Sequence, residues 1–437
     1  READLIDVWF DSGSMPYAQW HYPFENKEFI DKKRFYPADF IAEGVDQTRG
    51  WFYTLHAIST MVFDSISYKN VVSNGLVLDK NGQKMSKRLG NAIDPFETLS
   101  DFGPDATRWY MISNSNPWDN LKFDLGGVEE IKRKFFGTLY NTYSFFALYA
   151  NIDKFTLDEK EIEFDQRPEL DRWILSELNT LIVNVDDFYN DYEPTKAARA
   201  INSFVIDNLS NWYVRLSRRR FWKGEYEKDK ISAYQTLYRV LMDVAKLSAP
   251  ISPFFMDRLF IDLTRNINNN YSESIHLEDF PVADKSKIDL KLQQKIKYAQ
   301  IISSLVLSLR AKEKIKVRQP LSKILIPVTN SEQKVIINSV SNEIKREVNV
   351  KSIEFIEGES DMLVKSIKPN YKKLGPAYGR YMKEISSLVR SLDNSSILNL
   401  EKTGKIDLLI DKKTITFNID DFEISSKDIE GWQVANE

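Results

Sequence analysis

Two lysines and an arginine stand within five consecutive residues, Lys84-Met85-Ser86-Lys87-Arg88. Upstream, Asn81-Gly82 predicts a tight hairpin turn in which both residues adopt positive φ angles. Downstream, Asp94-Pro95 predicts the N-cap and first turn of a helix. We therefore expect a mobile connection between ordered elements, whose ammonium groups could neutralise charge that develops on a phosphate during transfer. The alternative is a solvated basic turn, because most charge runs lie on the surface.

A second group of polar side chains, Glu43, Asp46 and Gln47, follows a short apolar run. We expect that run, residues 40–42, to form a buried parallel strand. The polar side chains then lie beyond its carboxyl end, where open α/β sheets place their ligands. Carboxylate and amide oxygens there could accept hydrogen bonds from ammonium and hydroxyl groups of a ligand. The alternative is that Glu43 and Asp46 form structural ion pairs with Arg49.

Three segments resemble the isoleucyl-tRNA synthetases of the class I aminoacyl-tRNA synthetase family. Residues 84–88 match the KMSKS-type signature of the class. Residues 7–14, Asp-Val-Trp-Phe-Asp-Ser-Gly-Ser, are similar to a stretch typical of the isoleucine enzymes, where the valine enzymes usually carry a DTWFSS-like variant. Residues 43–52 resemble the EGxDQxRGW segment of the same family. The segments stand in the expected order, and similarity runs along nearly the whole chain.

The resemblance implies that the basic segment binds ATP. Lys84 and Lys87 would be the catalytic residues, contacting the ATP phosphates and the charge that develops as the substrate carboxylate attacks the α-phosphorus. Arg88 would have a supporting role. ATP, accompanied by Mg²⁺, would be a substrate. The chain has no cysteine and three scattered histidines, so we expect no zinc or other metal site in it.

Further positions around the adenylate follow from the resemblance. Glu43 would bind the aminoacyl-adenylate, and Asp46 and Gln47 would lie near its amino and carbonyl end. Asn74 and Gly75 would approach the nucleotide base, because glycine permits close backbone contact. The expected nucleotide-binding set is Glu43, Gly44, Asp46, Gln47, Asn74, Gly75, Lys84, Met85, Ser86, Lys87 and Arg88.

Two tryptophans, Trp9 and Trp51, are the candidates for the flat apolar walls of an isoleucine side-chain pocket, with core packing as the alternative. Such a pocket gains only about 1–3 kcal/mol from one methylene, so these walls alone would not reject valine. The family uses a separate editing domain for this purpose, which we expect before Arg1.

One family motif is missing from the sequence. The class I site needs an HxGH-like motif, and neither His21-Tyr22 nor His56-Ala57 supplies it. We therefore expect a fragment that is cut at both ends, holds half of an active site and makes no useful amount of adenylate alone.

A helical region follows the expected catalytic part. Apolar residues at three-four spacing predict helices over 170–190, 195–222, 228–248 and 290–311. Its sequence resembles the class I anticodon-binding bundle. A basic cluster beside Phe221 and Trp222 suits unpaired RNA, although a solvated helix end is an equal alternative. The candidate tRNA-binding residues are Arg215, Arg218, Arg219, Arg220 and Lys223.

We expect four parts in the chain. These are the second half of a Rossmann-like α/β catalytic domain (1–110), stem-contact and linking helices (111–167), a helical anticodon-binding domain (168–322) and a small α+β region (323–437). In the last part, residues 323–328 and 353–356 predict strands around a helix at 331–348, and 406–410 with 414–419 predict a hairpin. The function of that part is not legible from sequence.

Composition limits the partners. The net charge of −4 means that RNA binding must rest on local basic patches. No apolar run is long enough to cross a membrane, and we expect a cytoplasmic monomer. The expected partners are tRNA(Ile), isoleucine and ATP. The alternatives are a valyl- or leucyl-type class I synthetase and a non-catalytic tRNA-binding module that retains the fold.

Overall fold

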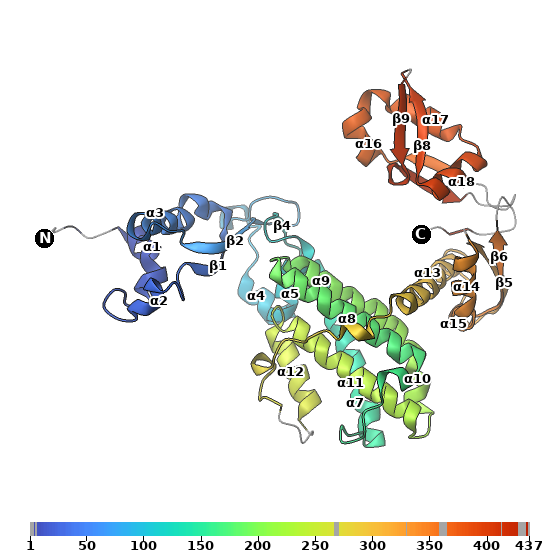
Figure 1. Ribbon diagram of the computed structural model, residues 1–437, viewed down its shortest axis with the longest axis horizontal. Coiled ribbons are helices and arrows are strands. Elements are labelled where there is room, and N and C mark those ends of the chain that lie inside the picture. The colour runs from blue at the N-terminus through green and yellow to red at the C-terminus, as the bar shows by residue number, and fades with distance from the viewer. Residues whose placement is uncertain are drawn as a thin grey trace. The chain divides into compact units, whose positions relative to one another are not determined.

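The computed structural model describes residue 4 and residues 7–265, 271–328, 330–357, 365–411, 413–426 and 434–435. The chain forms two compact units, residues 1–289 and 290–437, and each is described by itself (Figure 1). Among the described residues, no helix combines the length and apolarity that crossing a membrane requires.

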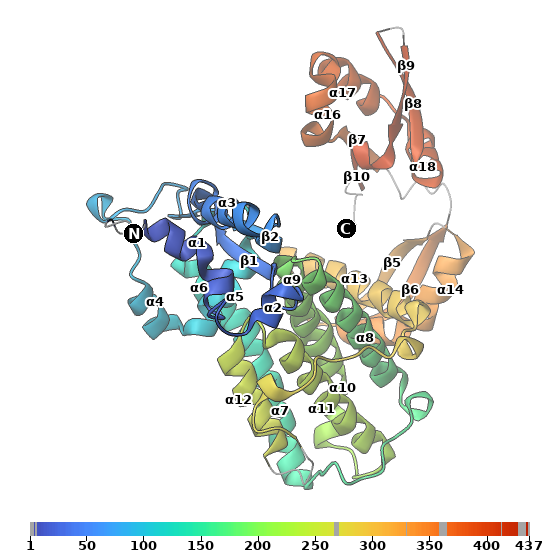
Figure 2. The same cartoon turned by 60° about the vertical axis from the view of Figure 1, so that its left-hand side comes forward.

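The first unit begins with a β-α-β arrangement. Strands β1 (Ala38–Gly44) and β2 (Tyr68–Asn74) pair in parallel, with Ala38 opposite Tyr68 and Gly44 opposite Asn74. They are joined by the 3₁₀ turn η1 (Val45–Arg49) and helix α3 (Trp51–Phe63). Helix α1 (Val8–Ala18) packs on α3, and the short α2 (Lys27–Asp31) follows α1 in the chain (Figure 2). The carboxyl ends of both strands therefore lie at one edge.

Strand β1 confirms the predicted parallel strand, but the prediction that it is buried is wrong. Phe40 is 45% exposed. Its ring stacks on Tyr192 with centroids 5.0 Å apart and planes 5° apart. Tyr192 follows helix α8 (Glu169–Asn190) of the helical region. Part of β1 is therefore open to solvent.

The segment after β2 carries the basic residues. Strand β3 (Val77–Leu78) pairs in parallel with β4 (Leu121–Lys122), and the 3₁₀ turn η2 (Lys87–Leu89) lies between them in sequence. Helices α4 (Pro95–Phe102) and α5 (Pro104–Asn114) follow η2. Asp94 confirms its predicted role as N-cap, because its Oδ1 accepts a hydrogen bond from the amide of Phe96 at 2.8 Å.

A long aromatic-rich helical stretch comes next. It consists of α6 (Leu125–Ile131), the π-helical turn η3 (Lys132–Phe136) and α7 (Gly137–Asp153). Phe135, Leu139 and Phe146 are buried on one face. The π turn interrupts the α-helical hydrogen bonding between α6 and α7.

The helical bundle of the first unit agrees with the predicted helices. After α8 come α9 (Pro194–Ser203), the π-helical η5 (Phe204–Val214), α10 (Arg215–Trp222), α11 (Lys228–Ser248) and α12 (Pro253–Thr264). Short 3₁₀ turns lie at η4 (Phe164–Gln166), η6 (Ile275–Leu277) and η7 (Lys285–Lys287). Much of α8 and nearly all of α11 are buried, so these two helices form the bundle core.

The bundle is attached to α5 by polar contacts at helix ends. Thr195 Oγ1 donates to the carbonyl oxygen of Ile112 at 2.7 Å. Arg199 donates through Nε and Nη2 to the carbonyl oxygens of Ser113 and Asn114 at 2.8 and 2.9 Å. These contacts satisfy carbonyls that the end of α5 would otherwise leave unpaired. They join the basic-loop region to the bundle.

The second unit starts with α13 (Leu290–Lys312), which the sequence placed with the bundle. Strands β5 (Leu321–Val328) and β6 (Val350–Glu357) pair in parallel, which confirms both predicted strands. The predicted helix at 331–348 is two helices, α14 (Ser331–Ser339) and α15 (Ser341–Val348).

The rest of the second unit contains more strands and helices than predicted. The hairpin of β8 (Lys405–Ile410) and β9 (Lys413–Asn418) is confirmed. The prediction missed the antiparallel pair β7 (Lys365–Pro369) and β10 (Phe422–Ser426). It also missed α16 (Tyr371–Tyr378), η8 (Gly379–Tyr381), α17 (Met382–Arg390), α18 (Asn394–Thr403) and η9 (Ile419–Asp421).

Candidate active site and basic surfaces

The turn before the basic residues is wider than predicted. The amide of Asp79 donates to the carbonyl oxygen of Gln83 at 2.8 Å, and Leu78 bridges to Lys84. Of the two central residues, Gly82 alone has a positive φ, at 82°. The predicted two-residue turn with positive φ at Asn81 is therefore wrong. The chain instead uses a longer turn that ends in one left-handed glycine.

Two side chains hold this segment in place. The carboxylate of Asp79 accepts hydrogen bonds from the amides of Asn81 and Gln83 at 2.9 and 2.8 Å. The side-chain amide of Asn91 donates to Asp79 Oδ2 at 3.0 Å and to the carbonyl oxygen of Lys84 at 3.2 Å. Its Oδ1 accepts from the amide of Ser86 at 2.9 Å. Hydrogen bonds thus hold the backbone at Lys84 and Ser86, and the mobility of the segment stays a prediction.

The same contacts lower the pKa of Asp79. The hydrogen bond from Asn91 and the backbone amide of Gln83 hold the pKa of this carboxyl below its ordinary value. Asp79 is therefore ionised near neutral pH. Sequence reasoning missed Asn91, because nothing local indicates that an asparagine twelve residues away closes the turn.

The basic side chains themselves point to solvent. Lys84, Lys87 and Arg88 are exposed. Among the described residues, none of these three side chains forms an ion pair or hydrogen bond. Ser86 Oγ accepts from the amide of Leu89 at 3.2 Å and starts η2, while Met85 is half-buried. The backbone is held while the cationic groups remain available to an anionic ligand.

The polar residues after β1 lie at the strand edge. Glu43 is opposite Ser73 in β2. The side chain of Gln47 donates to Asp46 at 3.3 Å, and its Oε1 accepts from the amide of Trp51 at 3.0 Å. Gln47 thereby caps the start of α3 in addition to any contact with a ligand.

The alternative of structural ion pairs at this edge finds no support in the described residues. There, Arg49 forms no ion pair with Glu43 or Asp46. In the same residues, no hydrogen bond or ion pair joins Glu43 to Lys84 or Lys87. The expected roles of Glu43 at the adenylate and of the two lysines at the ATP phosphates stay predictions.

The two tryptophans lie near the start of α3. The indole N–H of Trp51 donates to the carbonyl oxygen of Ser12 at 2.9 Å. Trp9 is 47% exposed. A Cβ on Gly50 would lie 3.5 Å from the Trp9 ring, so this ring packs beside the turn that carries Gln47. Neither ring is fully buried, and their role as pocket walls stays a prediction.

Gly75, which directly follows β2, has no room for a side chain. A Cβ on Gly75 would lie 2.3 Å from the carbonyl oxygen of Asp119. The amide of Gly75 donates to Pro117 at 2.8 Å, and the amide of Leu76 donates to the side chain of Asn120 at 2.9 Å. Close backbone contact is thus used within the chain, and contact of Asn74 and Gly75 with a nucleotide stays a prediction.

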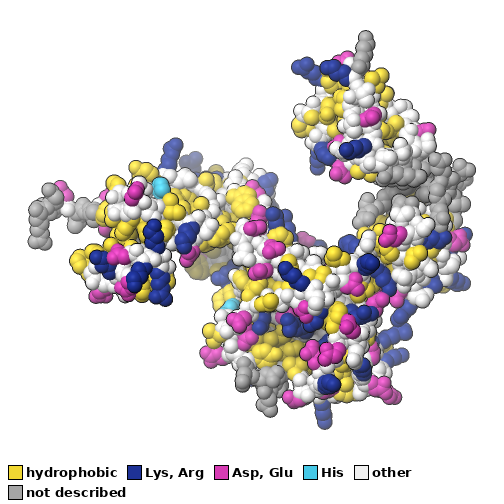
Figure 3. All heavy atoms as spheres, viewed as in Figure 1, with side chains coloured by type: hydrophobic (Ala, Val, Ile, Leu, Met, Phe, Trp, Pro, Cys, Tyr) yellow, Lys and Arg dark blue, Asp and Glu magenta, His cyan; other side chains and the backbone are white. Residues whose placement is uncertain are grey.

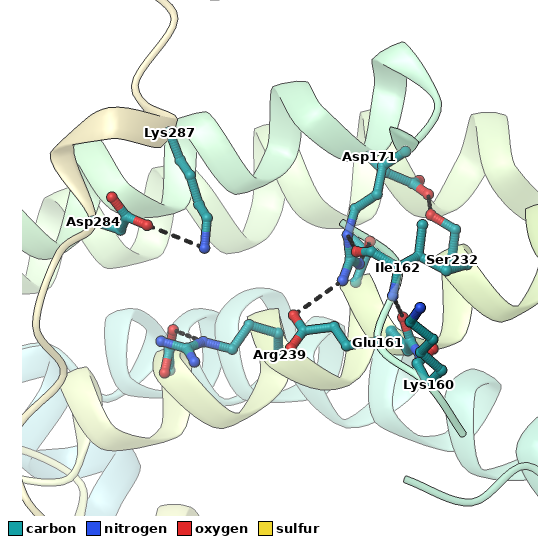
Figure 4. A network of polar contacts seen from close by, with 12 residues as sticks. Lys160, Glu161, Ile162, Asp171, Ser232, Arg239, Asp284 and Lys287 are labelled. Atoms are coloured by element: carbon teal, nitrogen blue, oxygen red, sulfur yellow. Dashed lines mark hydrogen bonds and ion pairs between the residues drawn. The ribbon is translucent and has the colours of Figure 1, made fainter. Parts of the chain in front are cut away.

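One member of the basic cluster in the bundle is structural. Arg220 Nη1 and Nη2 donate to Asp171 Oδ1 and Oδ2 at 2.6 and 2.8 Å. Asp171 is fully buried and also accepts from Tyr213 and Ser232, at 2.9 and 2.6 Å. Figure 4 shows Ser232 facing Asp171 in this network. The prediction that Arg220 contacts tRNA is therefore corrected, because its guanidinium is occupied by a buried carboxylate.

The pKa shifts of Arg220 and Tyr213 agree with a structural role for Arg220. Burial alone would lower the pKa of Arg220, but the hydrogen bonds to Asp171 raise it above its ordinary value. Burial and the nearby Asp171 charge raise the pKa of Tyr213. Both donors therefore stay protonated throughout the physiological range.

The other residues of the cluster face outward. Arg215, Arg218, Arg219 and Lys223 are exposed. Lys223 Nζ lies 5.1 Å from the ring centroid of Trp222, which is 55% exposed. Phe221 is buried in the core. Exposed cations beside one exposed indole can hold phosphates and stack a base.

Histidine and carboxylate side chains do not gather into a metal-binding group in the described part of the chain. There, no three His, Cys, Asp or Glu side chains come together as a metal site would require. A metal that accompanies a nucleotide substrate is a separate matter, because such an ion is held largely by phosphates.

Comparisons with known proteins place both regions in families. Residues 1–124 match the family model described as tRNA synthetases class I (I, L, M and V). Residues 171–325 match the model described as anticodon-binding domain of tRNA ligase. The first match contains the strand edge and the basic loop, and the second contains the basic cluster of the bundle.

Similar curated proteins carry one name. Isoleucine–tRNA ligases of Bacteroides thetaiotaomicron and Cytophaga hutchinsonii are 61% and 60% identical over all 437 residues. That of Clostridium tetani is 45% identical over the whole chain. The chain covers 38%, 39% and 41% of these three proteins, so it spans about two fifths of the curated relatives it matches.

A solved structure shows a similar fold. The crystal structure of the ternary complex of Agrobacterium radiobacter K84 agnB2 LeuRS-tRNA-LeuAMS matches with a TM-score of 0.51. The identity is 16%, and the match covers 83% of this chain and 42% of that chain. At this identity the likeness concerns the fold alone.

Proposed function

The chain belongs to the isoleucine–tRNA ligase family, with a class I synthetase segment followed by an anticodon-binding segment, and we propose that it works as part of such a ligase. The full ligase activates isoleucine with ATP and transfers it to tRNA(Ile). One observation carries the proposal. Lys84 and Lys87 are exposed and without acidic partners in the described residues, on a segment whose backbone Asp79 and Asn91 hold in place.

The proposed chemistry follows from those charges. The isoleucine carboxylate attacks the α-phosphorus of ATP, the bond to the pyrophosphate oxygen breaks, and isoleucyl-adenylate forms. Negative charge grows on the phosphate oxygens during this step, and the ammonium groups of Lys84 and Lys87 stabilise it. Arg88 supports them, and Mg²⁺ accompanies ATP. A terminal ribose hydroxyl of tRNA then attacks the activated carbonyl, and AMP leaves.

The strand edge is proposed as the binding site for the adenylate. Glu43 binds the aminoacyl-adenylate, while Asp46 and Gln47 lie near its amino and carbonyl end. Parallel strands that end together support this placement, because ligands of such sheets bind beyond the carboxyl ends. Gly44, Asn74, Gly75, Met85 and Ser86 complete the proposed nucleotide contacts.

The amino-acid pocket is proposed beside α3. Trp9 and Trp51 form apolar walls for the isoleucine side chain. The partial exposure of Trp9 beside the turn of Gln47 supports this role, because a purely structural tryptophan would be expected to be more deeply buried.

We propose the same four parts that the sequence predicts. Residues 1–110 form the second half of a Rossmann-like catalytic domain, residues 111–167 brace it, residues 168–322 bind the anticodon side of tRNA, and residues 323–437 form a small α/β region. The match of residues 171–325 to the anticodon-binding model supports the third boundary, although α13 packs within the second unit. In the bundle, Arg215, Arg218, Arg219 and Lys223 are the proposed tRNA contacts, and Arg220 is left out.

The proposal is tested with Lys84→Ala in a full-length ligase that carries this segment. Isoleucine-dependent exchange of pyrophosphate into ATP should fall about 100- to 1,000-fold, because one transition-state contact is lost. Lys80→Ala is the matched control, since Lys80 is an exposed lysine of the same turn. Unchanged exchange in Lys84→Ala would favour a non-catalytic tRNA-binding module.

Amino-acid preference is measured in the same assay. Isoleucine should be activated in preference to valine by about 10- to 200-fold, the limit that one methylene allows. Faster exchange with valine or leucine would assign the chain to the corresponding type of class I enzyme.

A further inference from the structure

An open depression of about 370 Å³ lies on α16 and α17 of the second unit. It is lined by Tyr371, Met382, Lys383, Ser386, Ser387 and Arg390. Two of these side chains are cationic, three carry hydroxyls, and none is a carboxylate. The lining can therefore attract and hydrogen-bond an anion, and it offers a metal ion no ligand that it prefers.

The helical spacing places the two cations on one outer face. Lys383 and Arg390 are seven residues apart on α17, or about 10 Å along the helix axis. Ile385 and Val389 are fully buried in the core that Leu374 of α16 also joins. Because α17 packs through its apolar side, its cations are left outside, far enough apart to contact different phosphates of one strand.

These cations are not used inside the protein. Lys383 and Arg390 are exposed, and within the described residues neither forms an ion pair. Tyr371 is 53% exposed, and its hydroxyl lies 3.1 Å from Ser386 Oγ, a hydrogen bond that ties α16 to α17. The aromatic ring is thus held beside the cations while much of it stays open to solvent.

Charge in this part of the chain is unevenly distributed. Residues 371–390 contain five Lys and Arg but one Glu, whereas residues 391–426 contain four Lys and seven Asp and Glu. On the face visible in Figure 3, this part of the chain presents Lys and Arg side chains beside hydrophobic ones. Lys373 is paired with Asp421 at 2.9 Å, and the other four cations still leave residues 371–390 with an excess of positive charge, although the whole chain is acidic.

We propose that the outer face of α16 and α17, named here the α16–α17 face, binds the sugar-phosphate backbone of the tRNA. Lys383 and Arg390 hold phosphates, the serine hydroxyls donate to phosphate oxygens, and Tyr371 stacks on an unpaired base. The mixture of separated cations, hydroxyls and an open aromatic ring favours RNA over an acidic protein segment, which offers no base to stack. The inference rests on the proposed function, because it takes the substrate tRNA as the ligand.

The test uses the full-length ligase with Lys383→Ala and Arg390→Ala together. Binding of the tRNA(Ile) transcript is measured by fluorescence anisotropy between about 50 and 200 mM salt. The double variant should bind several-fold more weakly, and the slope of log affinity against log salt should fall by about 1 to 2. The matched control is Lys405→Ala with Lys413→Ala, two exposed lysines of the β8–β9 hairpin in the same unit.

Two further measurements keep the result unambiguous. Isoleucine-dependent pyrophosphate exchange needs no tRNA and should stay unchanged in the double variant. A wild type without exchange would refute the proposed function, whereas exchange with unaltered tRNA binding would refute this inference alone. Tyr371→Phe should retain most of the affinity and Tyr371→Ala should lose it, because phenylalanine keeps the stacking ring.

The contradicting outcomes are equally definite. Equal tRNA affinity and salt slope in the wild type and the double variant would overturn the proposal. So would an equal loss in the hairpin control, because it would indicate general attraction to a basic unit. Binding of inorganic phosphate at the α16–α17 face with no change in tRNA binding would overturn it in favour of a free-anion site.

Discussion

The two basic segments of the first unit, residues 84–88 and 215–223, differ in what lies opposite their charges. In the first, Asp79 is the nearby carboxylate, and it binds backbone amides and Asn91. In the second, Asp171 is fully buried and takes the guanidinium of Arg220 in two hydrogen bonds. A carboxylate that fixes backbone leaves its basic neighbours available to a substrate, whereas one that binds a guanidinium makes that residue part of the core.

The largest effect is expected on stability when Arg220, whose charge is paired with a buried carboxylate, is replaced. Arg220→Ala leaves the buried Asp171 without its ion-pair partner and should lower the free energy of unfolding by about 3–5 kcal/mol. Urea unfolding of the full-length ligase measures it. Arg219→Ala, an exposed neighbour, should change stability by less than about 0.5 kcal/mol. Equal stability losses in the two variants would remove the distinction between the segments.

The next effect concerns the residue that holds the loop. Asn91→Ala removes the hydrogen bonds to Asp79, Ser86 and Lys84, and isoleucine-dependent exchange should fall about tenfold because the lysines lose their fixed backbone. Asn120→Ala is the comparison, since Asn120 holds Leu76 outside the loop. An unchanged exchange rate in Asn91→Ala would mean that the loop needs no such support.

A smaller effect is expected at the exposed end of the bundle cluster. Lys223→Ala should weaken tRNA binding a few-fold and lower the salt slope by about 1, because one phosphate contact is lost. Stability should not change, since the side chain is exposed. If the salt slope stays the same and the protein is destabilised, Lys223 belongs with Arg220 as a structural residue.

The smallest effect is the pH dependence of the loop. The hydrogen bond from Asn91 holds the pKa of Asp79 below its ordinary value in the folded protein, so the contribution of Asp79 to stability is complete above the unfolded pKa and is lost as pH falls through the folded pKa. The stability advantage of the wild type over Asp79→Asn should be constant above about pH 5 and shrink below about pH 4. Thermal unfolding across this range measures it, and an advantage that disappears near pH 7 would contradict the assignment.

Local chemistry made much of the fold predictable. Asp94 caps its helix as its position before Pro95 indicates, and the parallel strand at residues 40–42 is present. Long-range partners were not predictable in this way. Asp171 lies 49 positions from Arg220, and no periodicity links them. The same limit explains the missed contact of Asn91 with Asp79 and the unexpected exposure of Phe40.

The candidate site was predictable as a set of motifs but not as a geometry. The sequence identifies Lys84, Lys87 and Glu43 as candidates, and all three lie in the segment that matches the class I synthetase model. It cannot show which charges are already paired, because pairing depends on side chains brought together by folding. Arg220 illustrates this limit, since by sequence it is equivalent to Arg218 and Arg219.

The most direct measurement compares Lys87→Ala with Arg220→Ala in one full-length ligase, recording isoleucine-dependent exchange and urea unfolding on the same preparations. For Lys87→Ala we predict a loss of exchange of about 100-fold or more with unchanged stability, and for Arg220→Ala a large loss of stability. Normal exchange in Lys87→Ala, or a destabilisation equal to that of Arg220→Ala, would contradict the account.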